Sequence, residues 1–324
     1  MLAKLADGMK IRCFCRLVNS FCKGKSDLIM VCWADSISFR TINDTQSALP
    51  ILLIKENFFD EYEFTHNENK FTAEIPVSYI KYALKYALFP SSIIININSE
   101  NSTLTIEMVD YYEISHKWVF ALNETIVYNA VYDMTEVTGS LTCRWDIFDG
   151  MDKAFKGNEM VTLHFNKKNK RHPIVFHTQE LFYKDKVSCI LRLESSENCD
   201  LKASDEMKIT FSLSDFIFAI KICSVLSQKA NIYCIGPGSP LIIKADMPNN
   251  ISFEMALGTS RDEEEEDNEN QEEEGKASLF NKKGPVVFVP NKNSYLSDEE
   301  EFSAKGANTT PTSKRVTFPP PSFK

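Results

Sequence analysis

Apolar and polar positions alternate along the first 258 residues with two periods, one of two residues and one of about 3.6. Strand-length runs with Asn, Pro and Gly between them predict β-strands, and longer stretches with an apolar stripe predict amphipathic helices. We expect helices at about 9–23, 76–89, 144–157 and 214–229. We expect strands near 27–32, 36–42, 48–54, 70–75, 92–98, 103–109, 114–121, 160–166, 172–178, 187–194, 207–212, 231–235, 240–245 and 251–257.

The order of these elements recurs, which predicts two like-built halves. Each half would hold two helices on a mostly antiparallel sheet, an α+β fold in duplicate. The expected halves are residues 1–128 and 129–258, with a hinge at about 122–138. Residues 259–324 are acidic, punctuated by Pro and poor in periodic apolar positions, so we expect a disordered tail. Two apolar islands in it, SLF and VVFV, are interpreted as docking segments.

The composition is that of a folded protein without an export signal. Hydrophobic residues are 43% and aromatic residues 11% of the chain, which excludes collagen-like and wholly disordered proteins. No apolar stretch approaches the roughly 18 residues of a membrane helix, and the first residues lack the pattern of a secretory leader. The nine cysteines are therefore expected to be reduced thiols of a cytosolic or nuclear protein, mostly filling the core.

The net charge of −9 is shared between the two parts of the chain, but two of the expected helices are cationic. On the helix at 9–23, an apolar stripe faces one way, and Arg12, Arg16 and Lys23 line the other side. On the helix at 76–89, Lys81 and Lys85 share an edge, again without a carboxylate. Such faces are either plain solvated surfaces or contacts to a phosphate backbone, which would give sequence-independent, salt-sensitive affinity.

The second half carries weaker cationic signals. Lys153 and Lys156 share a helix face with acidic residues, and Lys221 lies on a narrow polar strip of the helix at 214–229. A further cluster, Lys167, Lys168, Lys170 and Arg171, fits a DNA contact, an import signal or a solvated hairpin equally well. We therefore expect a lopsided positive surface that is stronger in the first half.

Three segments suggest a family. They are SFRTIN at 38–43, ENFFDEYEF at 56–64 and PGSPLIIKADMPNNISFEMAL at 237–257. The region 35–64 resembles the first half of PCNA-type sliding clamps. Together the three segments resemble the Rad9 subunit of the heterotrimeric DNA-damage checkpoint clamp, over nearly all of residues 1–258, although 122–205 match loosely.

The resemblance implies a non-enzymatic subunit of a nuclear ring, without a cofactor or metal. The ring would contain two sister clamp subunits, encircle double-stranded DNA without sequence specificity, and be loaded by an ATP-dependent clamp loader. Helices would line the inner wall of such a ring. The candidate DNA-binding residues are then Arg12, Arg16, Lys23, Lys81 and Lys85, followed by Lys153, Lys156 and Lys221.

The acidic tail also fits this family, whose members carry a phosphorylated C-terminal extension. Ser297 directly precedes four acids, a pattern typical of an acid-directed kinase, and Thr310 precedes a proline. The resemblance implies that a tail phosphate is bound by a BRCT-repeat scaffold, through which the checkpoint kinase is activated. KRVTF at 314–318 fits a phosphatase docking pattern, with Val316 and Phe318 as its apolar anchors.

Two alternatives remain open. One is a homotrimeric processivity clamp for replication. The other is a metal-dependent nuclease that uses Asp146, Asp149 and Asp152, although these three read more simply as a solvated helix face. The sequence has no phosphate-binding loop, no nucleophile elbow and no His-Glu-x-x-His pair.

Overall fold

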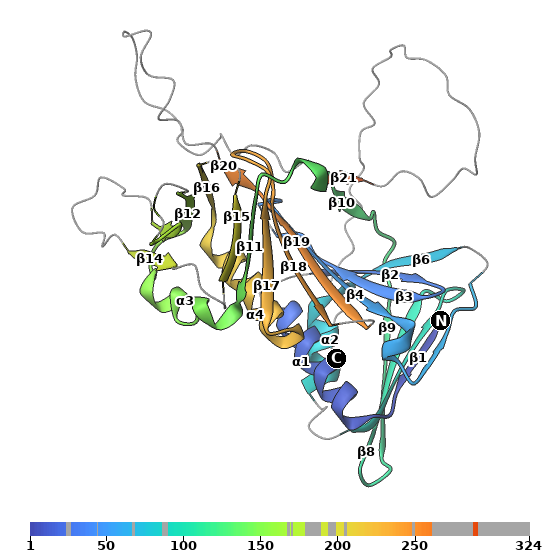
Figure 1. The fold of residues 1–324 in the computed structure, drawn as a ribbon. Coiled ribbons are helices and arrows are strands. Elements are labelled where there is room, and N and C mark those ends of the chain that lie inside the picture. Colours follow the sequence, from blue (N-terminus) through green and yellow to red (C-terminus); the bar gives the residue numbers. More distant parts are fainter. Residues whose placement is uncertain are drawn as a thin grey trace, which may run out of the picture. The chain divides into compact units, whose positions relative to one another are not determined.

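The apolar runs of the sequence form antiparallel sheets in the computed structural model (Figure 1). The structure describes residues 1–23, 27–43, 45–66, 69–85, 90–166, 169, 171–178, 189–193, 199–203, 206–247, 250–260 and 288–290. Its first part contains β1 (Leu2–Leu5), α1 (Gly8–Phe21), β2 (Asp27–Trp33), β3 (Ser36–Arg40), β4 (Ala48–Lys55), the 3-10 turn η1 (Glu56–Phe58), β5 (Glu61–Glu63), β6 (Lys70–Pro76), α2 (Val77–Lys85), β7 (Pro90–Asn98), β8 (Thr103–Asp110) and β9 (Ser115–Ala121). In the described residues no helix is long and apolar enough to cross a membrane.

A connector follows and leads into a second set of strands. The connector holds β10 (Tyr128–Ala130) and the 3-10 turn η2 (Met134–Glu136). The second set contains β11 (Gly139–Arg144), the 3-10 turn η3 (Trp145–Phe148), α3 (Met151–Ala154), β12 (Met160–Phe165), β13 (Ile174–His177), β14 (Ile190–Leu193), β15 (Cys199–Ala203), β16 (Met207–Ser212), α4 (Leu213–Leu226), β17 (Lys229–Cys234), β18 (Leu241–Met247), β19 (Ile251–Leu257), β20 (Thr259–Ser260) and β21 (Phe288–Pro290).

A nine-stranded sheet joins the two sets of strands. Its order is β15-β11-β17-β18-β19-β4-β3-β2-β6, so β19 from the second set pairs antiparallel with β4 from the first. Two five-stranded sheets, β5-β1-β7-β8-β9 and β14-β13-β12-β16-β20, complete the main fold. The α+β class with antiparallel sheets and few helices is therefore confirmed.

The strand order is the same in the two sets. The order β5-β1-β7-β8-β9 corresponds position by position to β15-β11-β17-β18-β19, and β6-β2-β3-β4 corresponds to β16-β12-β13-β14. The helices also fall at equivalent points, because α2 follows β6 as α4 follows β16. Among the described strands, β20 beyond β16 and β21 have no counterpart in the first set.

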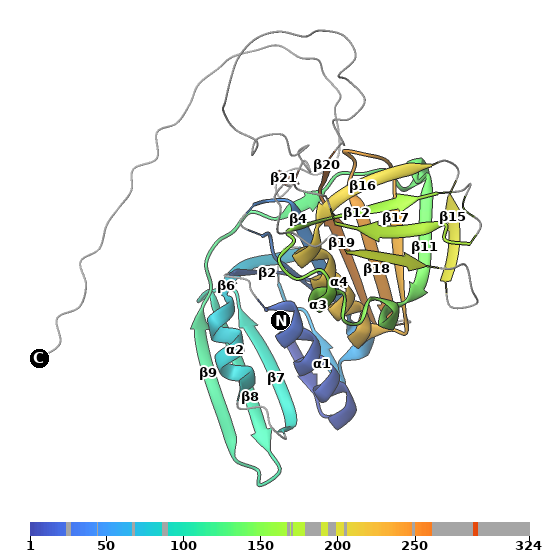
Figure 2. The ribbon, with the colours of Figure 1, turned by 90° about the vertical axis from the view of Figure 1, so that its left-hand side faces the viewer.

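The four helices lie in a row beside the sheets (Figures 1 and 2). Helix α1 contacts both α2 and α4, and α3 contacts α4. Helix α1 begins at Asp7, whose carboxylate accepts hydrogen bonds from the N–H groups of Met9 and Lys10. The Phe21 ring at the end of α1 lies 6.2 Å from the ring of Phe218 on α4, so the core is continuous between the two sets of elements.

The long helix expected at 144–157 is wrong. The chain forms η3 there, then an extended residue at Asp149, Gly150 at φ +80°, and the one-turn helix α3. Phe148, Met151 and Phe155 are all buried, and their spacing of three and four produced the helical pattern. Left-handed Gly150 interrupts the backbone between the first two of them, because a glycine has no Cβ to clash in that conformation.

The tail expected to be disordered from residue 259 holds two exceptions among the described residues. Strand β20 pairs with β16, and β21 pairs with β10 in the connector. The apolar island at 286–289 thus contributes its last two residues to a strand, whereas the island at 278–280 lies outside the described residues. The short strands β1, β5, β10, β11 and β15 were also not predicted.

Candidate nucleic-acid interface

Helix α1 presents its cations on the side opposite its buried stripe. Ile11, Phe14, Leu17, Val18 and Phe21 are buried, as their spacing predicted. Arg12, Arg16 and Lys23 are exposed, and no carboxylate among the described residues forms an ion pair with them. The α1 surface is therefore charged and available for a phosphate contact.

Helix α2 adds its cations beside those of α1. Lys81 and Lys85 are exposed, while Val77, Ile80 and Leu84 on the opposite side are buried. Burial raises the pKa of Cys22, just after α1, to about 12, and nearby Lys81 acts in the opposite direction. Helices α1 and α2 contact each other, so their exposed cations lie on neighbouring helices.

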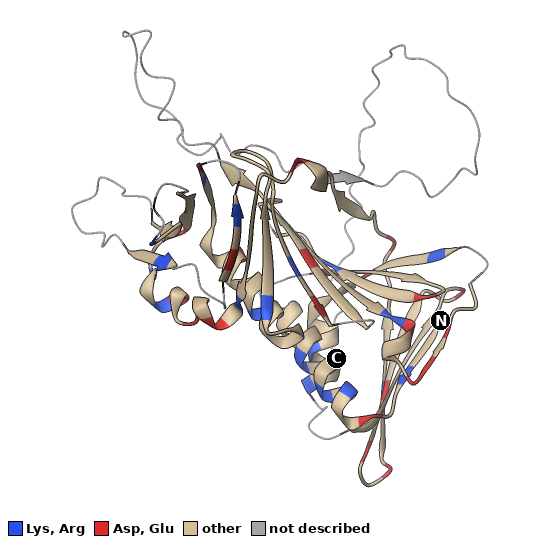
Figure 3. Cartoon of the chain, in the orientation of Figure 1, with Lys and Arg blue, Asp and Glu red and all other residues tan. Residues whose placement is uncertain are grey.

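Figure 3 shows this surface as blue segments on α1 and α2, with red segments near α3. At the N-terminal end of α1 the pattern changes, because Lys10 donates a 2.7 Å hydrogen bond to the Asp60 carboxylate. Lys10 is therefore neutralised, and the available charge starts with Arg12. We define the cationic surface as Arg12, Arg16, Lys23, Lys81 and Lys85.

The cations of the second half differ in whether an acidic residue pairs with them. Lys221 on α4 lies 3.4 Å from the Asp152 carboxylate on α3, so its charge is largely balanced. Lys153 and Lys156 are exposed, but the helix that was expected to align them is only four residues long. The predicted lopsided charge distribution agrees with these contacts.

The acidic residues proposed for a nuclease are not gathered into a metal site. Asp146 pairs with Arg144, and Asp152 pairs with Lys221. Within the described residues, no group of three or more His, Cys, Asp and Glu side chains could hold a metal ion. No specific contact of these residues therefore favours metal-dependent cleavage.

Several predicted positions lie outside the described residues. These are Ser297, Thr310, Val316 and Phe318 in the tail, and Lys167, Lys168 and Lys170 in the basic cluster. Their roles remain predictions from the sequence.

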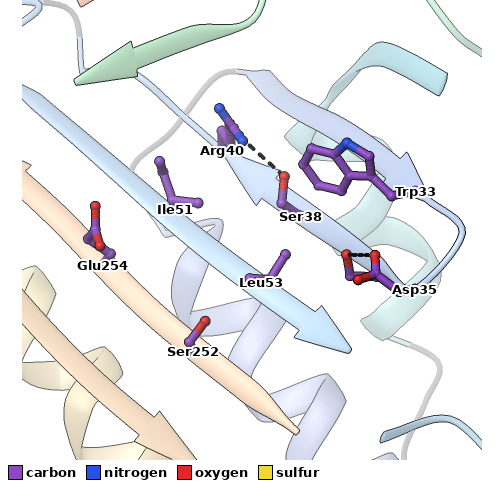
Figure 4. A pocket seen from close by; sticks show the side chains of 9 residues that line it. Trp33, Asp35, Ser38, Arg40, Ile51, Leu53, Ser252 and Glu254 are labelled. Atoms are coloured by element: carbon purple, nitrogen blue, oxygen red, sulfur yellow. Dashed lines mark hydrogen bonds between the residues drawn. The ribbon is translucent and has the colours of Figure 1, made fainter. Parts of the chain in front are cut away.

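Sequence reasoning missed a second feature, a surface hollow of about 420 Å³ on the nine-stranded sheet (Figure 4). It is lined by Trp33, Asp35, Ser36, Ser38, Arg40, Ile51, Leu53, Ser252 and Glu254. The strand alternation of SISFR, which places Ser36, Ser38 and Arg40 on one face, is the signal that could have revealed it.

Arg40 is the central charged group of this hollow. Its guanidinium is largely buried, donates to Ser38 Oγ at 3.2 Å, and lies 5.9 Å from the Trp33 ring centroid. Burial lowers the pKa of Arg40, and the Glu254 carboxylate opposes that shift. On the other side Nη1 donates to the connector, to Tyr128 O at 3.1 Å and to Asn129 Oδ1 at 2.6 Å. Arg40 thus ties the connector to the sheet.

Comparison with protein families identifies the class of protein. The family model described as Rad9 matches residues 14–260, which include all four helices except the start of α1. The match defines a checkpoint clamp subunit of the PCNA-like class, which is generally non-enzymatic. The chain belongs to the Rad9 family, the Rad9 subunit of the 9-1-1 clamp, so the predicted family is confirmed. Comparison with curated proteins found no match.

Proposed function

We propose that this chain assembles with two sister subunits into a closed ring that encircles double-stranded DNA at damage sites. The observation that carries this proposal is the junction between β4 and β19. There β19 of the second set pairs antiparallel with β4 over seven positions, from Ile251↔Ile54 to Leu257↔Ala48.

The repeated strand order leaves two unpaired edge strands that correspond to the two partners of this junction. Strand β9 corresponds to β19, and β14 corresponds to β4, yet each is the edge strand of its sheet among the described residues. A β9 edge on one molecule could therefore pair with a β14 edge on the next, as β19 pairs with β4 within the chain. Such head-to-tail contacts close into a ring when the rotation between molecules permits it.

The surface of β9 supports a role in assembly. Val119 is 60% exposed and Ile114, just before the strand, is 54% exposed. Exposed apolar edge strands promote pairing with another chain, and monomeric proteins usually protect them. In a ring of this kind the cationic surface of α1 and α2 would face DNA, and enclosure would hold the ring in place even with modest phosphate contacts.

Family membership supports further proposals about loading and signalling. We propose that an ATP-dependent loader opens the ring and that the ring acts in the nucleus. We further propose that a phosphate on Ser297 recruits a BRCT-repeat scaffold. Thr310 is a second candidate phosphorylation site, and Val316 with Phe318 is a candidate phosphatase docking site.

The Ser297 proposal is tested by replacing Ser297 with alanine, which should spare loading and abolish scaffold recruitment in a pull-down. Normal recruitment would remove Ser297 from the proposal.

Assembly is tested by adding charge to β9. Val119→Lys should abolish complex formation with the sister subunits in size-exclusion chromatography with light scattering, because a lysine on the edge disfavours strand pairing. Val131→Lys is the matched control, since Val131 is 62% exposed but lies in the connector. Unimpaired assembly of the Val119→Lys chain would contradict the proposed edge.

A homotrimeric clamp is the second candidate, because both unpaired edges belong to this one chain. The same measurement on the chain alone distinguishes the two. A stable trimer without other subunits would replace the heterotrimer proposal.

A further inference from the structure

The turn between β8 and β9 exposes large apolar side chains at one end of a sheet. Tyr111 is 83% exposed and Tyr112 is 81% exposed, and Ile114 at the end of the turn is 54% exposed. The two tyrosine rings contact each other edge to face, with centroids 5.9 Å apart. Turns are usually built from Gly, Pro, Asn, Asp and Ser. This turn, which is the lower end of its sheet in Figures 1 and 2, is therefore unusual in composition. We call residues 110–114 the aromatic tip.

Hydrogen bonds hold the backbone of the aromatic tip. Asp110 Oδ1 accepts from the N–H groups of Tyr112 at 2.8 Å and Ile114 at 2.9 Å. The Asp110 N–H donates to Ile114 O at 3.0 Å, and the Glu113 N–H donates to Asp110 O at 3.1 Å. Glu113 adopts φ +61°, a left-handed conformation that is uncommon for residues other than glycine. The two rings therefore stand on a fixed support, which reduces the entropy that is lost when they bind a partner.

The neighbouring turn of the same sheet shows that this construction does not require aromatic residues. Between β7 and β8, Asn98 Oδ1 accepts from the N–H groups of Glu100 at 2.9 Å and Asn101 at 3.2 Å. Ser102 in this turn also has a positive φ, of +47°. The residues of this turn, 99–102, are all polar. Folding alone therefore does not explain the two tyrosines, because a similar turn forms without them.

The junction inside the chain indicates what the aromatic tip contacts once β9 is paired. Strand β19 corresponds to β9. The turn before β19 ends at Asn250, whose main-chain oxygen accepts from the N–H of Lys55 at 2.8 Å. Lys55 is the last residue of β4, the strand that pairs with β19. By the same geometry, the turn before β9 would lie against the end of the strand that pairs with β9.

The two junctions differ in what holds them together. Strands β4 and β19 belong to one chain, so their pairing is intramolecular. Strand β9 would pair with a separate chain, and such an association costs translational and rotational freedom. A few buried aromatic anchors commonly supply most of the binding energy of an interface, since each ring buries about 150–250 Å². The turn before β19 reads Pro-Asn-Asn, whereas the turn before β9 supplies two such rings.

We propose that the aromatic tip anchors this chain to the sister subunit that pairs with β9, an inference that rests on the ring proposed above. The tip binds an apolar pocket at the end of the sister subunit's edge strand, and this pocket takes the rings of Tyr111 and Tyr112. Asp110 and Glu113 place carboxylates beside the rings, so the pocket has a rim of Lys or Arg. The tip thereby selects its partner, because a pocket without cations would leave these carboxylates unpaired.

The first test removes both rings. Tyr111→Ser with Tyr112→Ser should weaken the affinity of the full chain for the two sister subunits by about 30-fold, the loss typical of a hot-spot anchor. The affinity is measured by titrating the fluorescently labelled chain with the sister subunits. Glu100→Ser with Asn101→Ser is the matched control at the tip of the neighbouring hairpin, and its affinity should equal that of the unaltered chain. Both variants should keep their Tm, since all four residues are exposed.

The second test concerns the cationic rim of the pocket. Glu113→Lys should slow association with the sister subunits at low salt, and the difference should disappear at high salt, because exposed charges act through screened attraction. Glu100→Lys makes the same charge change on the turn between β7 and β8, so it should slow association less. Equal association rates for the Glu113→Lys and unaltered chains at every salt concentration would contradict the cationic rim.

The Val119→Lys chain separates this inference from the ring itself. If Val119→Lys blocks assembly while the double tyrosine variant binds as tightly as the unaltered chain, the ring stands and the anchor is wrong. If both variants assemble normally, the proposed edge and the anchor are both wrong. A trimer of the chain alone that the double variant dissociates would assign the tip to a second copy of this chain and overturn the sister-subunit assignment.

Discussion

The cationic surface makes a quantitative prediction about salt. Replacing Arg12, Arg16, Lys81 and Lys85 together by Gln removes four exposed charges that no described carboxylate balances. If each contacts one phosphate, the slope of log K against log salt falls in magnitude by about 0.9 per contact, or about 3.6 in all. Between 50 and 200 mM salt, a factor of four, that slope corresponds to about a 100-fold change in affinity.

The assay is equilibrium binding of the assembled clamp to a linear duplex, measured by fluorescence anisotropy over this salt range. The fourfold variant should lose affinity at low salt and show the shallower slope. Its Tm should remain unchanged, because exposed substitutions typically alter stability by less than about 0.5 kcal/mol.

A matched control variant removes the same number of positive charges, four, from strands by Lys→Gln changes. It replaces Lys55, Lys202, Lys208 and Lys229, which are also exposed. Its salt slope should equal that of the unaltered clamp. The reasoning is refuted if the helix variant keeps the full slope, or if the strand variant loses as much.

Three further predictions concern the fold. The pKa of Asp60 is lowered to about 2, first by the Lys10 hydrogen bond, so the stability that this carboxylate contributes is present above about pH 4 and lost as the pH falls towards 2. In Asp60→Asn the free energy of unfolding should therefore depend less on pH in that window. Phe216→Ala should cost about 3–5 kcal/mol in urea unfolding, since the ring is fully buried among three others, and Phe218→Ala should cost less because Phe218 is only partly buried. Burial raises the pKa of Cys22 to about 12, so iodoacetamide at pH 8 should modify it only after unfolding; rapid labelling of the native chain would contradict its position.

The sequence predicted features that depend on neighbouring residues. The stripe of α1 and the strands β2, β3 and β4 that follow it obey local periodicity, and the structure confirms them. The same periodicity failed at 144–157, where buried residues at helical spacing are separated by left-handed Gly150. A spacing pattern records which side chains are buried, but it does not record a break in the backbone between them.

The candidate site likewise has one part that the sequence could predict and one part that it could not. The exposed cations of α1 and α2 could be found from helix geometry alone. Arg40 could not, because its partners Tyr128 and Asn129 lie 88 and 89 positions further along the chain. Pairing of β10 with β21 likewise depends on a contact between distant segments that no local pattern encodes.

The β4–β19 pairing has a consequence for biogenesis. Its partners lie 197 to 209 positions apart, so β4 has no neighbour on that side until β19 has been synthesised. At about 5–20 residues per second, this interval lasts about 10–40 s on the ribosome. During that time the unpaired edge of the apolar strand β4 (Ala48–Lys55) is open to mispairing with other nascent chains. Production of this protein should therefore depend on chaperone supply, with aggregation of truncated translation products that end before Ile251.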